Sequence, residues 1–231
     1  MVTPEQNATL MRPMTQEEVD QATKSMPLGK APGPDGFTTD FFHHCWDLVR
    51  KEAWEVVKET RTSGQVLLSL NVTFLTLIRK EEMDTNLKQF RPISLCNAIY
   101  KIITKVVANG LKPIMTFIIS KEQARYMEGS QIMYTIILSH EVIHSLNSTK
   151  APSILIKLYL SKYFDKASWK YLQAILDSFG LDQHWVNWIL NLISSAFFSI
   201  LVNGVPSQPF SPSRGIREGD PLSPFLFVLM A

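Results

Sequence analysis

The sequence predicts an α+β fold in which helices dominate and a small antiparallel sheet is inserted among them. Most of the 231 residues lie in segments whose apolar residues recur at helical spacing, while a few short segments are rich in β-branched residues. Hydrophobic residues make up 45% and charged residues 19% of the chain, a balance that excludes a disordered chain. A chain of this length can bury a large core without disulfides or a structural metal.

The first third is predicted to be helical around one rigid loop. Thr15-Gln16-Glu17-Glu18 fits a capping box that begins a helix ending near Met26. Two prolines and two glycines within 30–36 exclude a helix or a central strand there and predict a shaped loop. Helical spacing resumes over 39–60, and Gly64 follows as a helix-ending residue.

Two strands and a helix are expected next. Residues 72–78 are β-rich, and 90–94 read as a strand or loop edge because Pro92 cannot donate a hydrogen bond to a central ladder. The spacing over 97–111 predicts a helix that ends at Gly110 and Pro113.

The last 100 residues are also predicted to contain both helices and strands. A helix is expected over 130–146, and the stretch 153–160, which has little polar interruption, predicts a strand buried on both faces. Ser168 and Asp182 are expected to cap two helices, the first ending at Gly180 and the second near residue 194. Asn203-Gly204 between two β-rich runs predicts a hairpin, and the Gly/Pro-rich stretch after it a loop that opens into a helix at residue 224.

Charge is unevenly distributed along the chain. Residues 61–125 hold 10 Lys/Arg against 4 Asp/Glu, whereas residues 1–60 hold 6 against 10. The basic middle could be a polyanion-binding surface or simply a solvated face, and the sequence leaves both open.

Cys45 and Cys96 lack metal-ligand spacing and read as small buried residues in a reducing compartment. No signal peptide or membrane span is recognisable, so we expect an intracellular protein of the nucleus or cytoplasm with no membrane partner.

One short motif suggests zinc chemistry. His140-Glu141-Val142-Ile143-His144 is a formal match to H-E-x-x-H, in which two histidines share a helix face and the Glu acts as base. A third ligand is lacking, because no Asp, Glu, His or Cys follows until Asp165. Val142, Ile143 and Leu146 also resemble an ordinary buried stripe. A zinc hydrolase is therefore a minor alternative, and we expect no metal site here.

Four longer segments in a fixed order are more specific. They are KAPGPDG at 30–36, FRPISL at 90–95, LYLSKYFD at 158–165 and RGIREGDPLSP at 214–224. Together they resemble the reverse transcriptase domain of LINE-type (non-LTR) retrotransposons, particularly those of plants, from about Met14 onward. The resemblance implies a right-hand polymerase with an N-terminal segment at 1–27, a fingers-like region at 28–150 and a partial palm at 151–231.

The resemblance also implies roles for individual residues. Lys80 and Arg91 match positions that hold the phosphates of an incoming deoxynucleotide, and Phe164 matches the side chain that excludes a ribose 2′-hydroxyl. Glu218 and Gly219 lie in the loop that packs under the nucleotide. Implied partners are an RNA template and a DNA primer, contacted by basic residues, and the implied cofactor is Mg²⁺. The basic residues are Lys101, Lys105, Lys112, Arg214 and Arg217.

This sequence departs from the family pattern where the metal should bind. Tyr159 occupies the position of the first metal-binding Asp, and a neutral phenol is a poor Mg²⁺ ligand. Asp165 lies six residues later and cannot simply replace it. The other two carboxylates belong to a downstream hairpin that this chain does not reach, so no metal-binding or catalytic residue is intact. Glu218 replaces a Gln and adds a negative charge near the triphosphate.

We therefore expect a reverse transcriptase domain by descent that is catalytically inactive in this copy, a degenerate fragment of a transposable element. The alternative is a non-enzymatic nucleic-acid-binding remnant that uses the basic segment around Arg91, Lys101, Lys105 and Lys112.

Overall fold

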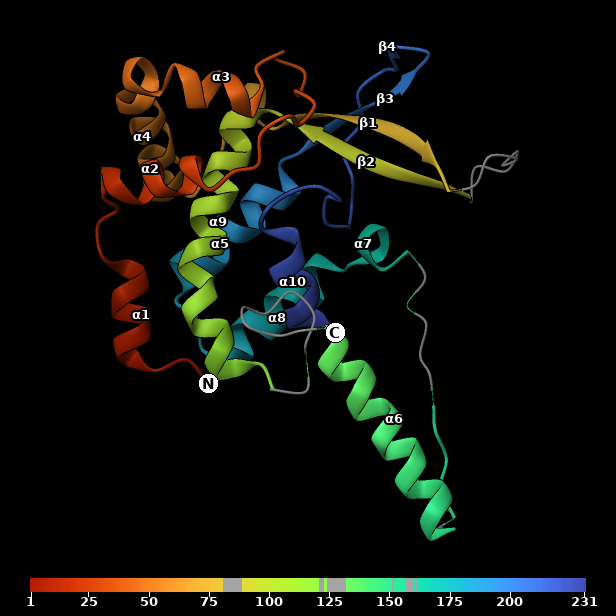
Figure 1. Cartoon of the computed structure of the whole chain (residues 1–231). Helices are drawn as coiled ribbons and strands as arrows, with labels where there is room; N and C mark the ends of the chain where they lie inside the picture. Colours follow the sequence, from red (N-terminus) through yellow and green to blue (C-terminus); the bar gives the residue numbers. More distant parts are fainter. Residues whose placement is uncertain (81–88, 121–122, 124–131, 151, 157–159, 161) are drawn as a thin grey trace.

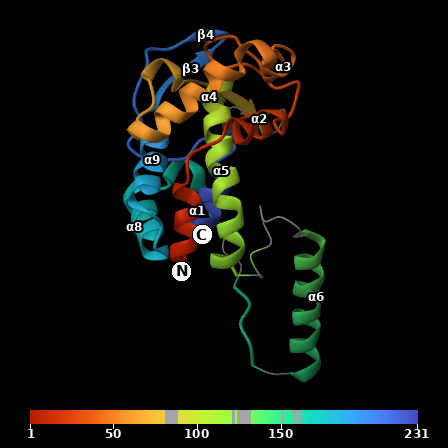
Figure 2. The ribbon, with the colours of Figure 1, turned by 90° about the vertical axis from the view of Figure 1, so that its left-hand side faces the viewer.

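The computed structural model describes residues 1–80, 89–120, 123, 132–150, 152–156, 160 and 162–231. A helical body carries a small sheet at one end, and one long helix stands apart from that body (Figures 1 and 2). The helices are α1 (Pro4–Met11), α2 (Gln16–Lys24), α3 (Thr39–His44), α4 (Trp46–Ser63), α5 (Ala98–Ile118), α6 (Ile132–Thr149), α7 (Tyr163–Lys166), α8 (Trp169–Phe179), α9 (Gln183–Ser194) and α10 (Ser223–Met230). The strands are β1 (Val72–Arg79), β2 (Phe90–Cys96), β3 (Phe197–Val202) and β4 (Val205–Pro206), and a short 3₁₀ turn spans Leu68–Leu70.

The sheet has the strand order β2-β1-β3-β4. β1 pairs with β2 in antiparallel fashion and with β3 in parallel fashion, so the sheet is mixed and the expectation of an antiparallel sheet is wrong. A parallel neighbour requires a long crossover, and here the helices between β1 and β3 provide it. Pro92 lies opposite Leu77 in β2, an edge strand, as its missing N–H predicts.

α5 forms the centre of the helical body. Its side chains Tyr100, Ile102 and Ile103 are fully buried, and it contacts α2, α4 and α10 (Figure 1). The prediction that this helix ends at Gly110 and Pro113 is wrong, because it continues to Ile118 with Pro113 inside it. Burial of Leu111, Ile114 and Met115 compensates for the hydrogen bond that a proline removes from a helix interior.

Gly110 has a packing role instead of a helix-ending one. A Cβ at this position would lie 2.6 Å from the Trp185 ring of α9. Only glycine lets the two helices approach this closely, so its position within a helix is explained by packing.

The expected helix over 39–60 is two helices. α3 and α4 meet at Cys45, and the chain changes direction there, so that Phe42 and Trp46 are both buried (Figure 1). Helical spacing runs through both elements, and therefore the pattern does not reveal the break. Cys96 is fully buried, as expected, whereas Cys45 is half-buried.

Several expectations from local sequence are confirmed. Thr15 and Glu18 form the capping box of α2, and Gly64 ends α4 in the left-handed conformation. Ser168 caps α8, which ends at Gly180. The other two confirmed signals are the Asp182 cap of α9 and the Asn203-Gly204 hairpin turn.

The segment from 132 to 160 differs most from expectation. α6 confirms the predicted helix, but Val142 and Ile143 are 45% and 40% exposed, so the expected buried stripe is wrong. The predicted strand is also wrong where it can be followed: residues 153–156 have no regular structure, and Ile154 is 88% exposed. A strand needs a neighbour for its hydrogen bonds, and no described strand lies beside this segment.

None of the described helices is long and apolar enough to cross a membrane.

Candidate functional site

A pocket of about 160 Å³ lies where the loop after β4 folds back against the sheet and α7. Its apolar wall includes Leu75 of β1, Pro92 of β2 and Phe198 of β3. Its polar groups are Ser94, Asp165, Arg214, Arg217 and Glu218. The pocket therefore joins residues that are far apart in the sequence, because strands β1 and β2 line it together with the RGIREGDPLSP segment.

Backbone hydrogen bonds fix this loop to its surroundings. Gly215 N donates to Ala167 O at 2.8 Å, and Ile216 N donates to Phe164 O at 2.8 Å. Ser94 N donates to Glu218 O at 3.0 Å, which ties the other end of the loop to β2. The loop is thus attached to α7 and to β2 at the same time, and the pocket lies between these two attachments.

Gly215 is required by this arrangement. Its φ of +98° lies in a region that side chains rarely adopt, and an added Cβ would lie 3.1 Å from Asp165 O. Gly219 has a φ of +102° and would bring a Cβ within 3.4 Å of Ser94 O. The two glycines let the backbone pass close to α7 and β2.

Several charged side chains act on Glu218, which lines this pocket together with Asp165. Burial raises the pKa of the Glu218 carboxyl, and the negative charge of Asp165 raises it further, while Arg91 and Lys80 lower it. Glu218 is half-buried, and Lys80, Arg91 and Asp165 are exposed. Of the residues to which the resemblance assigned a nucleotide-binding role, Glu218 lines the pocket, whereas Lys80 and Arg91 act on it electrostatically without lining the pocket.

Phe164 lies at the edge of this site and packs on α10. Its ring is stacked on Phe227, with centroids 5.4 Å apart and planes 11° apart. Tyr163 contacts the same Phe227 ring edge-on, and its hydroxyl donates to Met230 O at 2.8 Å. α7 is thereby anchored on α10, which fixes the direction of Phe164.

Arg217 does not present its side chain to solvent, contrary to the expectation for a nucleic-acid contact. It is 4% exposed, and its Nη2 donates to Asn71 Oδ1 at 2.5 Å. Its guanidinium also lies over the rings of Tyr100 and Phe198, at 4.2 and 5.5 Å from their centroids. A charged residue in a Gly/Pro-rich loop suggests a surface position, and only the tertiary packing reveals that this one is interior.

The other basic residues of the prediction are dispersed. Lys101, Lys105 and Lys112 are half-buried on α5 and do not line the pocket, whereas Arg214 does. Burial lowers the pKa of Lys105, and the nearby positive charge of Lys112 lowers it further.

Magnesium requires several oxygen ligands, chiefly carboxylates. Asp165 and Glu218 are the carboxylates of this pocket, and in the described ranges no group of three His, Cys, Asp or Glu side chains could hold a metal ion. The residues that can be placed therefore do not fit a magnesium site by themselves. Tyr159 lies outside the described residues, and His140, Glu141 and His144 are exposed on α6.

Sequence reasoning missed one member of the site. Asp165 was considered only as a substitute for the carboxylate missing at position 159, yet it lines the pocket and acts on the titration of Glu218. The hydrogen bonds of Gly215 and Ile216 to Ala167 and Phe164 create this proximity. No signal in the sequence indicates these pairings, because they join segments about 50 residues apart.

The chain is similar in sequence to a known protein family and to proteins of transposable elements. The family model described as reverse transcriptase (RNA-dependent DNA polymerase) matches residues 78–231. The chain is 30% identical over 220 residues, 95% of its length, to the uncharacterized 149 kDa protein of transposon TX1 from Xenopus laevis. It is 26% identical over 217 residues, 94% of its length, to a retrovirus-related Pol polyprotein from a type-1 retrotransposable element R2 of Popillia japonica.

A further relative is the retrovirus-related Pol polyprotein from the type-2 retrotransposable element R2DM of Drosophila melanogaster, 24% identical over 92% of this chain. The chain spans 17%, 29% and 20% of the length of these three relatives, respectively. The family match covers every residue that lines the pocket except Leu75 of β1. The chain belongs to the reverse transcriptase (RNA-dependent DNA polymerase) family, as a domain of the non-LTR retrotransposon type.

Proposed function

We propose that this chain is the fingers-like region (28–150) and partial palm (151–231) of a reverse transcriptase, and that its loop pocket holds the phosphates of a deoxynucleotide beside an RNA template and DNA primer. The observation that carries the proposal is that the positive charges of Arg91 and Lys80 act on Glu218, which lines the loop pocket. The guanidinium of Arg91 is suited to phosphate oxygens because its rigid fork binds them bidentately.

Polymerases of this family use a divalent metal ion such as Mg²⁺, which supplies charge neutralisation at the triphosphate. We further propose that this chain by itself does not extend a primer. Tyr159 supplies no carboxylate at the first metal position, and Asp165 and Glu218 are the carboxylates that line the pocket. Lys80 and Arg91 would then bind and orient phosphates without a completed metal site.

A primer-extension assay on the full 231-residue chain tests the inactivity. We expect no template-dependent incorporation with Mg²⁺ or Mn²⁺, because the acidic ligands are too few. Incorporation above that of a protein-free control would refute this part of the proposal.

Binding tests the remaining part. Filter binding of an RNA–DNA hybrid across a salt series should show an affinity that falls as salt rises, because phosphate contacts release counterions. Replacing one phosphate contact, Arg91→Gln, should weaken binding and reduce the salt slope by about one. Lys51→Gln, an exposed lysine of α4, is the matched control and should leave both unchanged.

The non-enzymatic remnant remains the second candidate function. It is supported by the half-buried Lys101, Lys105 and Lys112 of α5, which the pocket does not include. If the hybrid binds and binding is weakened in Lys101→Gln and Lys105→Gln as well as in Arg91→Gln, the second function replaces the first, because the two lysines do not line the loop pocket.

A further inference from the structure

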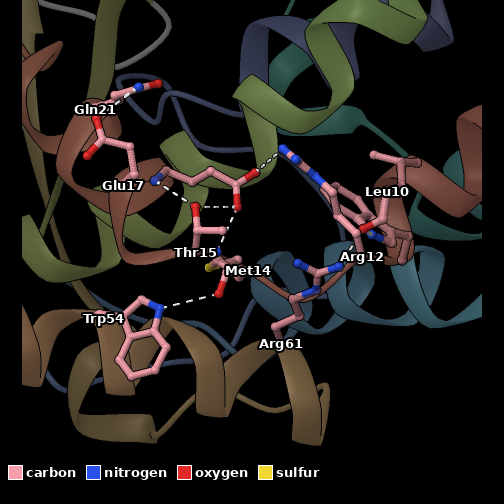
Figure 3. Close-up of polar contacts among 10 residues, drawn as sticks. Leu10, Arg12, Met14, Thr15, Glu17, Gln21, Trp54 and Arg61 are labelled. Atoms are coloured by element: carbon pink, nitrogen blue, oxygen red, sulfur yellow. Dashed lines mark hydrogen bonds and ion pairs between the residues drawn. The ribbon is translucent and has the colours of Figure 1, made fainter.

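A second cavity of about 250 Å³ lies between α1, α2, α4, α5 and α9, and it shares no lining residue with the loop pocket. Arg12 reaches it from the segment after α1, and Arg61 reaches it from the last turn of α4 (Figure 3). Asn109 of α5 adds an amide, and Trp185 of α9 adds an aromatic wall. We call this cavity the Arg12–Arg61 pocket.

The carboxylate of this pocket is fully used by other groups. Glu18 Oε1 accepts from Arg12 Nη2 at 2.7 Å. Glu18 Oε2 accepts from Thr15 N at 2.8 Å and from the Thr15 hydroxyl at 3.2 Å, as part of the capping box of α2 (Figure 3). Both carboxylate oxygens of Glu18 therefore have partners already: one is paired with Arg12 and the other caps α2.

Arg61 is the second positive charge, and it is half-buried. Its Nη2 donates to Leu10 O, a carbonyl that also accepts from Trp185 Nε1 at 2.9 Å. Within the part of the chain that the structure describes, no carboxylate lies within ion-pair distance of Arg61. A guanidinium has five N–H donors, so this single hydrogen bond leaves donors for a ligand in the cavity.

The electrostatics favour an anion. Burial lowers the pKa of Arg61, and the charge of Arg12 lowers it too, whereas Glu18 raises it. Two guanidinium groups and one carboxylate give this cluster a net charge of +1 in a partly desolvated site. A bound anion would relieve the repulsion between Arg12 and Arg61.

The size of the cavity restricts the ligand. Sites for drug-sized ligands usually occupy about 300–1,000 Å³, so a cavity of about 250 Å³ suits a single oxoanion and a few waters better than a nucleoside. Trp185 contributes to the cavity wall, but at 3% exposure it offers too little ring surface for a base to stack on. A planar fork of donors matches the oxygens of a phosphate group.

We propose that the Arg12–Arg61 pocket binds a phosphate group, with Arg61 donating N–H groups to its oxygens and Arg12 supplying the second positive charge. The site is separate from the loop pocket, and it does not depend on the activity proposed for that pocket.

Titration of the full chain with inorganic phosphate at constant ionic strength tests this site, with calorimetry and the melting temperature as readouts. We expect saturable binding and a rise in the melting temperature of the wild type. Arg61→Lys keeps the charge but loses the fork, and Arg12→Gln loses one charge. Each should weaken phosphate binding about tenfold, the equivalent of one charge-assisted hydrogen bond.

Arg50→Gln, an exposed arginine of the same helix α4, is the matched control and should bind phosphate like the wild type. If Arg61→Lys does not fold, Arg12→Gln decides alone, because the Arg12 side chain is 58% exposed and its replacement leaves the core intact. Absence of saturable binding to the wild type, or an unchanged affinity in the variants that fold, would overturn the proposal.

Two sources of the phosphate group can be distinguished in the same experiment. If a short single-stranded RNA displaces inorganic phosphate, and Arg12→Gln weakens this RNA, the ligand is a polynucleotide backbone. If RNA does not compete and phosphate still binds, the ligand is a small phosphate compound. Both results support the site and differ only in its natural ligand.

Discussion

The guanidinium of Arg217 lies 4.2 Å from the centroid of the Tyr100 ring, in the interior between the loop and α5. Its Nη2 donates to Asn71, while its Nε and Nη1 have no hydrogen-bond partner among the residues that the structure describes. Asp220 is also buried, and its charge acts on Arg217. Two residues of the RGIREGDPLSP segment thus anchor the loop in the core, and the loop in turn forms the wall of the pocket.

Arg217→Met should therefore destabilise the chain by about 1–3 kcal/mol, because it leaves the buried Asn71 Oδ1 without its donor and removes the positive charge that acts on buried Asp220. Arg217→Met combined with Asp220→Asn should cost less than the sum of the two single changes, since both interacting charges are then removed together. Urea unfolding of the four proteins measures this coupling. Arg214 is an exposed arginine of the same loop, and the free energy of unfolding of Arg214→Met should stay within about 0.5 kcal/mol of the wild-type value. An equal loss of stability in both variants would contradict the claim that Arg217 stabilises the loop through its interior position.

Glu218→Gln should change the pH dependence of stability. Burial, followed by the charge of Asp165, raises the pKa of Glu218 above its ordinary value of 4.5. The stabilisation from the protonated carboxyl is complete below the ordinary value and is lost as pH rises through the raised folded-state value. Gln stays neutral, so the stability of Glu218→Gln relative to wild type should increase from about pH 4.5 upward and then level off.

Urea unfolding at a series of pH values from acidic to neutral measures this difference. Glu218→Asp keeps the titrating carboxyl and should not show the same gain. A difference between Glu218→Gln and wild type that shrinks as pH rises would show that the sign of the shift is wrong.

Gly110→Ala should destabilise the packing of α5 against α9. The added Cβ would lie 2.6 Å from the Trp185 ring, which is 3% exposed and cannot move into solvent. Overpacking of this kind costs about 1–3 kcal/mol. Asn109→Ala, the exposed neighbour on the same helix, should cause no loss of stability, and thermal unfolding of both variants is the measurement.

Thr15→Ala should reduce stability by about 1 kcal/mol, because the Thr15 hydroxyl caps α2 and also donates to Glu18. Thr62→Ala on α4 removes an exposed hydroxyl bonded only within its own helix, and it should change stability by less than about 0.5 kcal/mol. Denaturant unfolding compares the two. Equal losses would mean that the capping box contributes nothing beyond an ordinary threonine.

Local signals predicted much of the secondary structure correctly. The caps at Thr15, Ser168 and Asp182 and the Asn203-Gly204 turn depend on side chains that bond to backbone within a few residues. Both partners of such an interaction lie within a few positions of each other, and therefore a single sequence reveals it.

Signals that depend on distant partners were misread. Pro113 predicted a helix end, yet α5 continues to Ile118, because side chains on both sides of the proline, such as Leu111 and Ile114, are buried in the core. The stretch 153–160 predicted a buried strand, but its described residues 153–156 have no regular structure, because hydrophobicity alone does not supply the neighbouring strand that a ladder needs.

The sequence by itself determined the helix-rich α+β class, most helix ends and the ordered segments that identify a reverse transcriptase, because these depend on neighbouring residues and on motif order. Only the tertiary structure decided that Arg217 is interior, that Asp165 joins Glu218, and that Arg12 and Arg61 share one cavity. The physical reason is that charge and burial are properties of the space around a side chain. That space is built by elements that lie far apart along the chain, as Tyr100 and Arg217 do.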